Sequence, residues 1–369
     1  MNLLYIQPHS EWGAAEEYFQ IITEGVKRAH PDWKLSLLCP LQTKERWHQH
    51  IGSFAEVIPA EKTLPALTRQ IKNVAPDLIH LNHPDIKALA ASRWARVPEI
   101  VITDHSAPTD IRYNWKGTLL WQFLKRASNL HLIAFAQANK KLLIEKHGFF
   151  EEQVDVIPHG LRSEAFDIVY DLAQVRHELN IPKESFLLMC VARLSKEKAH
   201  EVLLEALREV MKSTSKTVHL LFAGDGDRRT CLEAYAARLD LKDSVRFLGH
   251  RSDVARLLQS ADAFVLSSDF ESFGIAILEA MAVGKFVIAT QAVGNTELVS
   301  GGAGILVPPR NPKAFAEAIL WAMEHRVECQ KRGETARRCF LSEYTSEKMI
   351  EKTLALYERL LTDAGVASK

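Results

Sequence analysis

Short apolar runs alternate with amphipathic helical patterns along the first half of the chain. Runs rich in aliphatic residues predict strands, which lie at 2–7, 34–39, 78–81, 100–103, 132–136 and 154–157. Apolar residues three and four positions apart predict the helices between them, which lie at 14–29, 63–74 and 86–96. This alternation is typical of a parallel sheet with helices on both faces.

The same rhythm restarts after a polar, irregular stretch, 159–182, in which we place a linker. The second half has predicted strands at 186–191, 218–223, 245–248, 263–266 and 286–289, and predicted helices at 200–211, 228–239, 254–259 and 275–283. A last amphipathic helix, 346–361, has no strand after it. The pattern predicts an α/β protein with two Rossmann-like, doubly wound parallel-sheet domains, 1–165 and 166–345, that face an interdomain cleft.

Length and charge narrow the class of protein. A chain of 369 residues suggests two domains. Its 46 lysines and arginines balance its 46 aspartates and glutamates, so the whole chain has no general attraction to nucleic acid. Any site for an anion must therefore be local.

Cysteine usage and the N-terminal residues bear on the compartment. The five cysteines are odd in number and form no C-x-x-C pair, which argues against a zinc ribbon or a disulfide framework and favours a reducing, cytoplasmic compartment. The first residues lack a basic segment followed by an apolar core, so we interpret them as a strand and not as a signal peptide. No apolar run approaches the roughly 20 residues of a membrane span.

The loop after the predicted strand 263–266 holds the first candidate site, because parallel sheets bind ligands at the carboxyl ends of their strands. Gly274 lets the backbone approach a ligand closely where the helix 275–283 begins, and the free N–H groups of that helix end attract an anion. Glu271 lies in the loop, and Glu279 lies on the helix, which its apolar residues predict to be buried nearly all round.

A buried carboxylate such as Glu279 costs several kcal/mol unless it has a partner. That partner is either a cation in a structural salt bridge or the hydroxyl groups of a ligand. Two carboxylates on either side of a helix N-terminus suit a ligand with an anionic middle and hydroxylated ends. A nucleotide-sugar has this layout.

Two further loops carry candidate residues. Arg193 and Lys198 follow the strand 186–191 and could neutralise a pyrophosphate, although such a pair could equally be solvated surface charge. Gly224 follows the strand 218–223 and could let the backbone pass near a nucleotide. The G-x-G-x-x-G fingerprint fails because Arg229 stands at its third glycine, which argues against a nicotinamide-dependent dehydrogenase or epimerase.

Two of these segments match one known family. The segment ESFGIAILE, 271–279, matches the glutamate–seven–glutamate motif of retaining GT-B glycosyltransferases. The segment ARLSKEKA, 192–199, matches the family's GRL and EKG stretches, with alanine at both glycine positions. The chain resembles family 4 of these enzymes (the group 1 type) over most of its length, most closely from 193 to 299.

The resemblance implies specific roles in the second half of the chain. Glu271 would contact the hydroxyls of the donor sugar, and Glu279 would bind the ribose hydroxyls. Arg193 and Lys198 would stabilise the departing phosphates. The remaining implied donor-binding residues are Gly224, His250, Arg251, Phe273, Gly274 and Ile275. The D-x-D spelling at 225–227 would be a loop and not a metal site, since GT-B enzymes need no metal.

The first half matches the family less closely, as is expected of an acceptor-binding domain. Gly13 would bring the backbone near the donor phosphate or the acceptor, while Ala14 stands where the family has a second glycine. His105 follows the strand 100–103 and would line the catalytic centre near the donor sugar. His83 is a weaker candidate for contact with the acceptor.

The segment RYNWKGTLLWQFLKRASN, 112–129, mixes tryptophans with basic residues. Such a segment can dock on an anionic membrane surface, but an aromatic stripe at helical spacing is more often part of a core. Peripheral membrane contact and core packing both remain open at this point.

The family resemblance implies a retaining glycosyltransferase with the GT-B fold. The N-terminal domain would bind the acceptor, the C-terminal domain would bind the nucleotide-sugar, and the last helix, 346–369, would pack back on the N-terminal domain. The enzyme would move a hexose-type sugar, from UDP-sugar as the default, to a glycan, a lipid-linked sugar or a small metabolite. It would need no cofactor and bind no nucleic acid, and it would act in the cytoplasm or at the inner membrane face. The alternative is a non-catalytic nucleotide-sugar-binding protein of the same fold.

Overall fold

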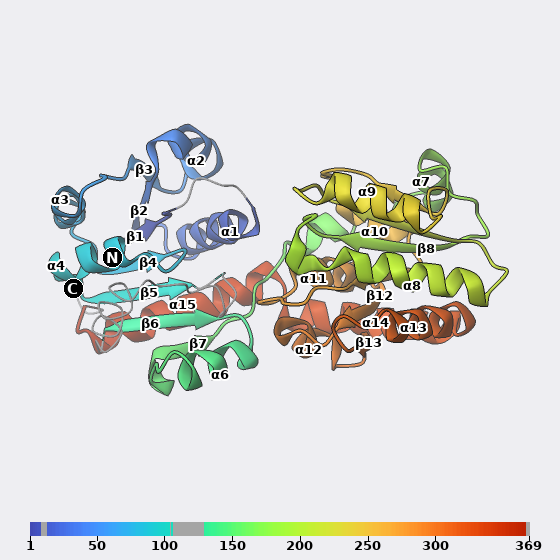
Figure 1. The fold of residues 1–369 in the computed structure, drawn as a ribbon. Helices are drawn as coiled ribbons and strands as arrows, with labels where there is room; N and C mark the ends of the chain where they lie inside the picture. Colours follow the sequence, from blue (N-terminus) through green and yellow to red (C-terminus); the bar gives the residue numbers. More distant parts are fainter. Residues whose placement is uncertain (9–12, 104, 106–128, 367–369) are drawn as a thin grey trace. The chain divides into compact units, whose positions relative to one another are not determined.

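The computed structural model describes residues 1–8, 13–103, 105 and 129–366. The chain divides into two compact units (Figure 1). The first unit comprises Met1–Gly160 together with Ser346–Lys369, and the second comprises Leu161–Thr345. The division after Gly160 falls slightly before the predicted boundary at 165.

The first unit is built on a parallel sheet of seven strands in the order β3-β2-β1-β4-β5-β6-β7. The strands are β1 (Asn2–Ile6), β2 (Lys34–Cys39), β3 (Glu56–Pro59), β4 (Leu78–Leu81), β5 (Glu99–Thr103), β6 (Leu130–Ala134) and β7 (Val154–Val156). The helices are α1 (Ala14–Ala29), α2 (Lys44–Ile51), α3 (Leu64–Val74), α4 (Ile86–Trp94), α6 (Gln137–Glu145) and α15 (Ser346–Asp363). The strand order reverses between β1 and β4, which makes the carboxyl ends of these two strands a switch point where ligands bind.

The C-terminal helix α15 is part of the first unit and packs against α1. Its amphipathic pattern gives it a buried face, which includes the fully buried Tyr357. The Tyr357 hydroxyl lies 2.5 Å from Nδ1 of His80 on β4, and Nε2 of His80 lies 2.6 Å from the Thr103 hydroxyl on β5. The last helix thereby completes a buried polar network in the centre of the first unit.

The second unit is built on a parallel sheet of six strands in the order β10-β9-β8-β11-β12-β13. The strands are β8 (Phe186–Val191), β9 (Val218–Ala223), β10 (Val245–Phe247), β11 (Ala263–Leu266), β12 (Phe286–Thr290) and β13 (Gly304–Val307). The helices are α7 (Leu172–Glu178), α8 (His200–Ser213), α9 (Arg229–Arg238), α10 (Val254–Ser260), α11 (Ile275–Ala282), α12 (Val293–Val299), α13 (Pro312–Glu324) and α14 (Arg326–Glu343). Here the strand order reverses between β8 and β11.

Helices cover both faces of the second sheet (Figure 1). Helix α13 packs against α8, and α14 packs against α11. The sheet residues between them are almost completely buried, as Leu188, Phe264 and Ile288 illustrate. Within the described part of the chain, no helix combines the length and the apolar character that crossing a membrane requires.

Candidate functional site

The loops that follow β8 and β11 bring Lys198 and Glu271 together. The Lys198 ammonium donates to Oε1 of Glu271 over 2.5 Å, although 73 residues separate the two in the sequence. Both side chains are mostly buried, with exposed fractions of 20% for Lys198 and 12% for Glu271. The hydroxyl of Ser268 donates to the same carboxylate oxygen over 2.7 Å. This partly buried ion pair at the carboxyl end of the sheet is the centre of the candidate site.

Hydrogen bonds fasten these two loops to each other. The Ser267 hydroxyl lies 2.9 Å from the carbonyl oxygens of both Lys198 and Ala199. The amide of Asp269 donates to the Glu197 carbonyl over 2.9 Å. The sequence analysis assigned no role in the site to Ser267 or Ser268. Two adjacent polar residues at the end of a fully apolar strand were the available signal, and both are completely buried.

Helix α11 begins at Gly274, which adopts a left-handed conformation with φ of +73°. A Cβ atom at this position would lie 2.8 Å from Oδ1 of Asn295, so glycine is needed both for its φ and for space. The N–H groups of Ile275 and the following residue have no partner within the helix, which leaves them available to an anion. Phe273, in contrast, is 2% exposed and packs its ring against Tyr344, so its side chain belongs to the core.

Helix α11 is not buried nearly all round, and that prediction is wrong. Glu279 is only partly buried and shares one side of the helix with other partly buried residues, which are Ile275, Ala276 and Val283. The opposite side is completely buried and includes Ile277, Leu278 and Met281. Apolar side chains occupy the partly buried side of the helix as well as the completely buried side, so the hydropathy pattern could not distinguish the two sides.

Arg193 lies on the same loop as Lys198 but is more exposed. Its side chain is 68% exposed, and its guanidinium lies 3.2 Å from the Glu197 carboxylate. This loop rests on the loop after β9, where Gly224 has a φ of +144° and a Cβ atom would lie 2.0 Å from the Ala192 carbonyl oxygen. Gly224 therefore permits the contact between two loops, which explains this glycine without any ligand.

His250 and Arg251 lie on the loop after β10. His250 is exposed. The guanidinium of Arg251 forms two hydrogen bonds to the Asp253 carboxylate, at 2.8 and 2.7 Å, which raise the pKa of Arg251. Strand β9 lies between β10 and β8 in the sheet, so these two residues follow a strand that is two positions from the one that precedes Lys198.

In the first unit, a chain of hydrogen bonds connects His105 to Gly13. Nε2 of His105 lies 2.9 Å from Oδ1 of Asn82, and Nδ2 of Asn82 donates to Oε1 of Gln7 over 2.6 Å. Nε2 of Gln7 donates to Oε1 of Glu16 over 2.6 Å, and Oε2 of Glu16 accepts from the Gly13 amide over 2.7 Å. Because the Asn82 amide nitrogen is the donor to Gln7, its oxygen must accept, so Nε2 of His105 carries the proton.

Burial keeps His105 neutral. Removal from water lowers the pKa of His105 well below its usual value, and the nearby His83, His159 and His80 lower it further. The ring of His83, the weaker acceptor candidate, lies 5.0 Å from that of His105. Nδ1 of His105 is therefore a lone-pair acceptor at neutral pH. Sequence reasoning did not assign a role to Gln7 or Glu16, because no local pattern reveals a partner several residues away on another element.

Two predictions concern residues or ligands that the structure does not test. The segment 112–129 lies outside the described residues except for Asn129, so its membrane contact stays a prediction. Among the described residues, no group of three or more His, Cys, Asp and Glu side chains is placed to hold a metal ion.

Two family models match most of the chain. The model described as "Glycosyl transferases group 1" matches residues 173–339, which lie within the second unit. The model described as "Glycosyltransferase Family 4" matches residues 43–164, most of which lie in the first unit.

Among curated proteins, the chain is similar to N-acetyl-alpha-D-glucosaminyl L-malate synthase of Bacillus anthracis, with 28% identity over 52% of this chain. That match spans about half the length of the relative, 50%. It is also similar to an Escherichia coli enzyme, UDP-Gal:alpha-D-GlcNAc-diphosphoundecaprenol alpha-1,3-galactosyltransferase, with 25% identity over 80% of this chain and 79% of the relative.

Among solved structures, the chain resembles Anabaena HepE in complex with UDP and glucose, with a TM-score of 0.82 and 24% identity over 97% of this chain and 99% of that one. At this identity the likeness establishes the fold, which has two Rossmann-like domains with parallel sheets. The two family matches show that the chain belongs to family 4 of the glycosyltransferases, the group 1 type, and the structural likeness shows that it has the GT-B fold.

Proposed function

We propose that the protein is a retaining glycosyltransferase that moves a hexose-type sugar from a nucleotide-sugar to a hydroxyl group. The observation that carries this proposal is the Lys198–Glu271 pair. It combines a cation for the departing phosphate with a carboxylate for the sugar hydroxyls. The two residues lie in two loops at the carboxyl end of the same sheet. The α11 N-terminus follows Glu271 directly and adds a partial positive charge for the phosphates.

The proposed reaction begins when the donor's pyrophosphate competes with Glu271 for the Lys198 ammonium. Lys198 then neutralises the charge that develops as the nucleoside diphosphate leaves, with help from Arg193 and the α11 N-terminus. Glu271, released from Lys198, holds the sugar hydroxyls, and Glu279 holds the ribose. The acceptor hydroxyl attacks the oxocarbenium-like sugar from the face that the phosphate leaves, and the departing phosphate takes its proton. The reaction needs no metal ion, as in other GT-B members of the family.

UDP is the nucleotide that we propose, and a small or lipid-linked hydroxyl compound is the proposed acceptor. The names of two similar proteins support this choice, because one is a UDP-galactose-dependent transferase and the HepE structures hold UDP or UDP-glucose. His105, whose tautomer is set by Asn82 and whose ring is kept neutral by burial, would contact the donor sugar. All five cysteines are free thiols, which agrees with the cytoplasmic location that we propose.

A thermal-shift screen with UDP-, GDP- and ADP-sugars tests donor binding. A donor at one hundred times its Kd stabilises the native state by about 2.7 kcal/mol. For a domain of roughly 150–250 residues this corresponds to a Tm increase of about 5–11 °C. If none of the three nucleotide classes raises Tm at saturating concentration, the proposal is wrong.

The second step measures transfer and hydrolysis of the stabilising donor by Lys198→Ala and a matched control. Lys196→Ala removes the same charge from an exposed lysine two residues away in the same loop. We expect the Lys198 variant to lose turnover and the Lys196 variant to keep it. A protein that binds the donor yet turns over none of it would instead be a non-catalytic nucleotide-sugar-binding protein, and unchanged turnover of the Lys198 variant would refute the mechanism.

A further inference from the structure

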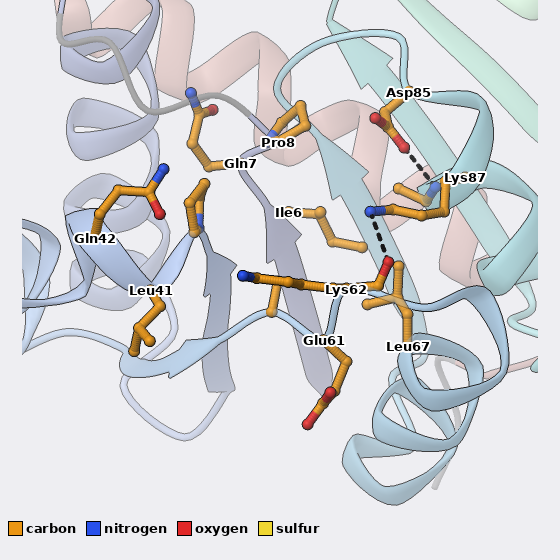
Figure 2. Close-up of a pocket in the computed structure, with 13 residues that line it drawn as sticks. Ile6, Gln7, Pro8, Leu41, Gln42, Glu61, Lys62, Leu67, Asp85 and Lys87 are labelled. Atoms are coloured by element: carbon orange, nitrogen blue, oxygen red, sulfur yellow. Dashed lines mark hydrogen bonds between the residues drawn. The ribbon is translucent and has the colours of Figure 1, made fainter.

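A cavity of about 330 Å³ lies at the carboxyl end of the first unit's sheet (Figure 2). Most of the residues that line it follow β1, β2, β3 and β4, in the loops or in the helices α3 and α4, so the cavity includes the switch point of the strand order. Its size is at the lower end of the range for small-molecule sites, which is roughly 300–1,000 Å³. The donor-binding residues proposed above do not line this cavity.

Two lysines and two acidic residues line the cavity, namely Lys62, Lys87, Glu61 and Asp85. The ammonium of Lys62 forms no hydrogen bond or ion pair within the part of the chain that the structure describes. The ammonium of Lys87 has one weak contact, to the Lys62 carbonyl oxygen at 3.4 Å. Figure 2 shows the Lys62 side chain running past Ile6 toward Gln42, while Lys87 enters from the opposite side.

Neither of the two carboxylates forms an ion pair with these lysines in the described part of the chain. Oδ1 of Asp85 accepts from the Ala88 amide over 2.6 Å and caps the start of α4. Figure 2 shows the Glu61 side chain pointing away from both ammonium groups. Lys62 also precedes the N-terminus of α3, where the Thr63 side chain makes no capping hydrogen bond, so that helix end adds a partial positive charge.

The cavity is connected to His105. Gln7 lines the cavity and is also a member of the hydrogen-bond chain, since its side-chain oxygen accepts from Asn82, which in turn accepts from His105. A molecule in the cavity can therefore contact, through Gln7, the network that orients the proposed catalytic histidine. This is where one end of an acceptor would be held while its hydroxyl group approaches the donor sugar.

We propose that this cavity is an acceptor subsite, in which Lys62 and Lys87 bind a phosphate or carboxylate group of a small anionic acceptor. The proposal rests on the proposed glycosyltransferase function and adds the chemical class of the acceptor. Two ammonium groups with free donors can each form a charge-assisted hydrogen bond to an anion, and the Gln42 amide can add a neutral one.

Three small probes test the chemistry of the cavity by isothermal titration calorimetry in the presence of UDP. Glycerol 3-phosphate represents a phosphate group, succinate represents carboxylate groups, and glycerol is the neutral control. We expect at least one anionic probe to bind, more weakly as salt concentration rises, and glycerol not to bind. The anionic probe that binds more tightly identifies the preferred group.

Matched variants locate the binding. In the double variant Lys62→Gln/Lys87→Gln, we expect the Kd of the anionic probe to rise about tenfold or more. Lys34→Gln removes one positive charge from the exposed first residue of β2 and should leave the Kd unchanged. Lys34 lies at the amino-terminal end of this parallel sheet, whereas the cavity lies at the carboxyl end. Circular dichroism and Tm of each variant verify that the fold is intact.

UDP titration separates this proposal from the proposed function. If UDP binds but neither anionic probe binds, or if the double variant binds the probe as tightly as the wild type, the acceptor subsite is refuted while the glycosyltransferase function stands. If an anionic probe binds through the two lysines but no nucleotide-sugar binds, the cavity is an anion site and its role as an acceptor subsite is refuted together with the proposed function.

Discussion

Replacing Ala199 with glycine should stabilise the second unit, contrary to the usual effect of glycine in or beside a helix. Ala199 is the residue between Lys198 and helix α8, and it has φ of +48° and ψ of +43°. This left-handed conformation costs a residue with a Cβ atom about 1–2 kcal/mol. Glycine avoids that cost but loses about 0.5–1 kcal/mol more backbone entropy on folding. The midpoints of the two ranges differ by about 0.75 kcal/mol, so we expect a net stabilisation of about 0.5–1 kcal/mol.

Ala234→Gly is the matched control, because it makes the same chemical change in the same unit. Ala234 is an exposed residue in the interior of helix α9, where its φ is negative. Here glycine should destabilise the unit by about 1 kcal/mol. The two substitutions are therefore expected to change the free energy of unfolding in opposite directions.

Differential scanning calorimetry or urea denaturation of the two variants and the wild type measures the effect. For a domain of roughly 150–250 residues, the Ala199 variant should have a Tm about 1–4 °C higher and the Ala234 variant a Tm about 2–4 °C lower. A loss of stability in the Ala199 variant equal to that in the Ala234 variant would refute the reasoning. Unchanged donor binding would show that the alanine stores strain without a role in the Lys198 geometry.

Three further predictions follow from buried groups. Burial lowers the pKa of His80 to about 3, from about 6.5 in the unfolded chain. The stability that the neutral ring contributes is therefore complete well above pH 6.5 and decreases as the pH is lowered. From pH 6.5 to 4.5 the loss is about 2 kcal/mol, measurable as faster hydrogen exchange in β4, and pH-independent exchange stability would contradict it. Gly224→Ala should lower the free energy of unfolding of the second unit, measured by urea denaturation, by an amount on the order of 3 kcal/mol, because its Cβ would meet a carbonyl oxygen at 2.0 Å. Gly301→Ala, with open space around its Cβ, should be nearly neutral, and equal effects would contradict the steric argument. Asn82→Ala should lower the kcat of transfer about 10–100-fold at unchanged donor Kd, because His105 loses its orienting acceptor, and an unchanged kcat would exclude that role.

Local patterns predicted every strand except β3 and β13, each of which lies at one edge of its sheet. Strands β1, β4, β8 and β11 are continuous apolar runs because both of their faces are covered by other elements. Strand β3 was not predicted because it is a four-residue edge strand, EVIP, with only two consecutive aliphatic residues. It ends in proline, which cannot donate a hydrogen bond to a neighbouring strand. Strand β13 also lies at an edge and begins with glycine, Gly304, so its apolar run is too short to stand out.

The candidate site was predictable in its residue types but not in its contacts. The motif placed Lys198 and Glu271 in two different loops, and nothing in either loop reveals that they form an ion pair in the unliganded protein. That pair depends on β8 and β11 being neighbours, which is a property of the sheet order. The orienting residues of His105 were missed for the same reason, since Gln7 and Asn82 directly follow β1 and β4 and meet only because those strands are adjacent.

The place of α15 has a consequence for synthesis of the chain on the ribosome. Domains generally fold in order from the N-terminus as they emerge. Here the second unit ends at Thr345, whereas the first unit still lacks Tyr357, which fills its centre and bonds His80. The unit whose sequence begins first is thus the one that is completed last, and until then the face of α1 that α15 covers stays exposed on the nascent chain.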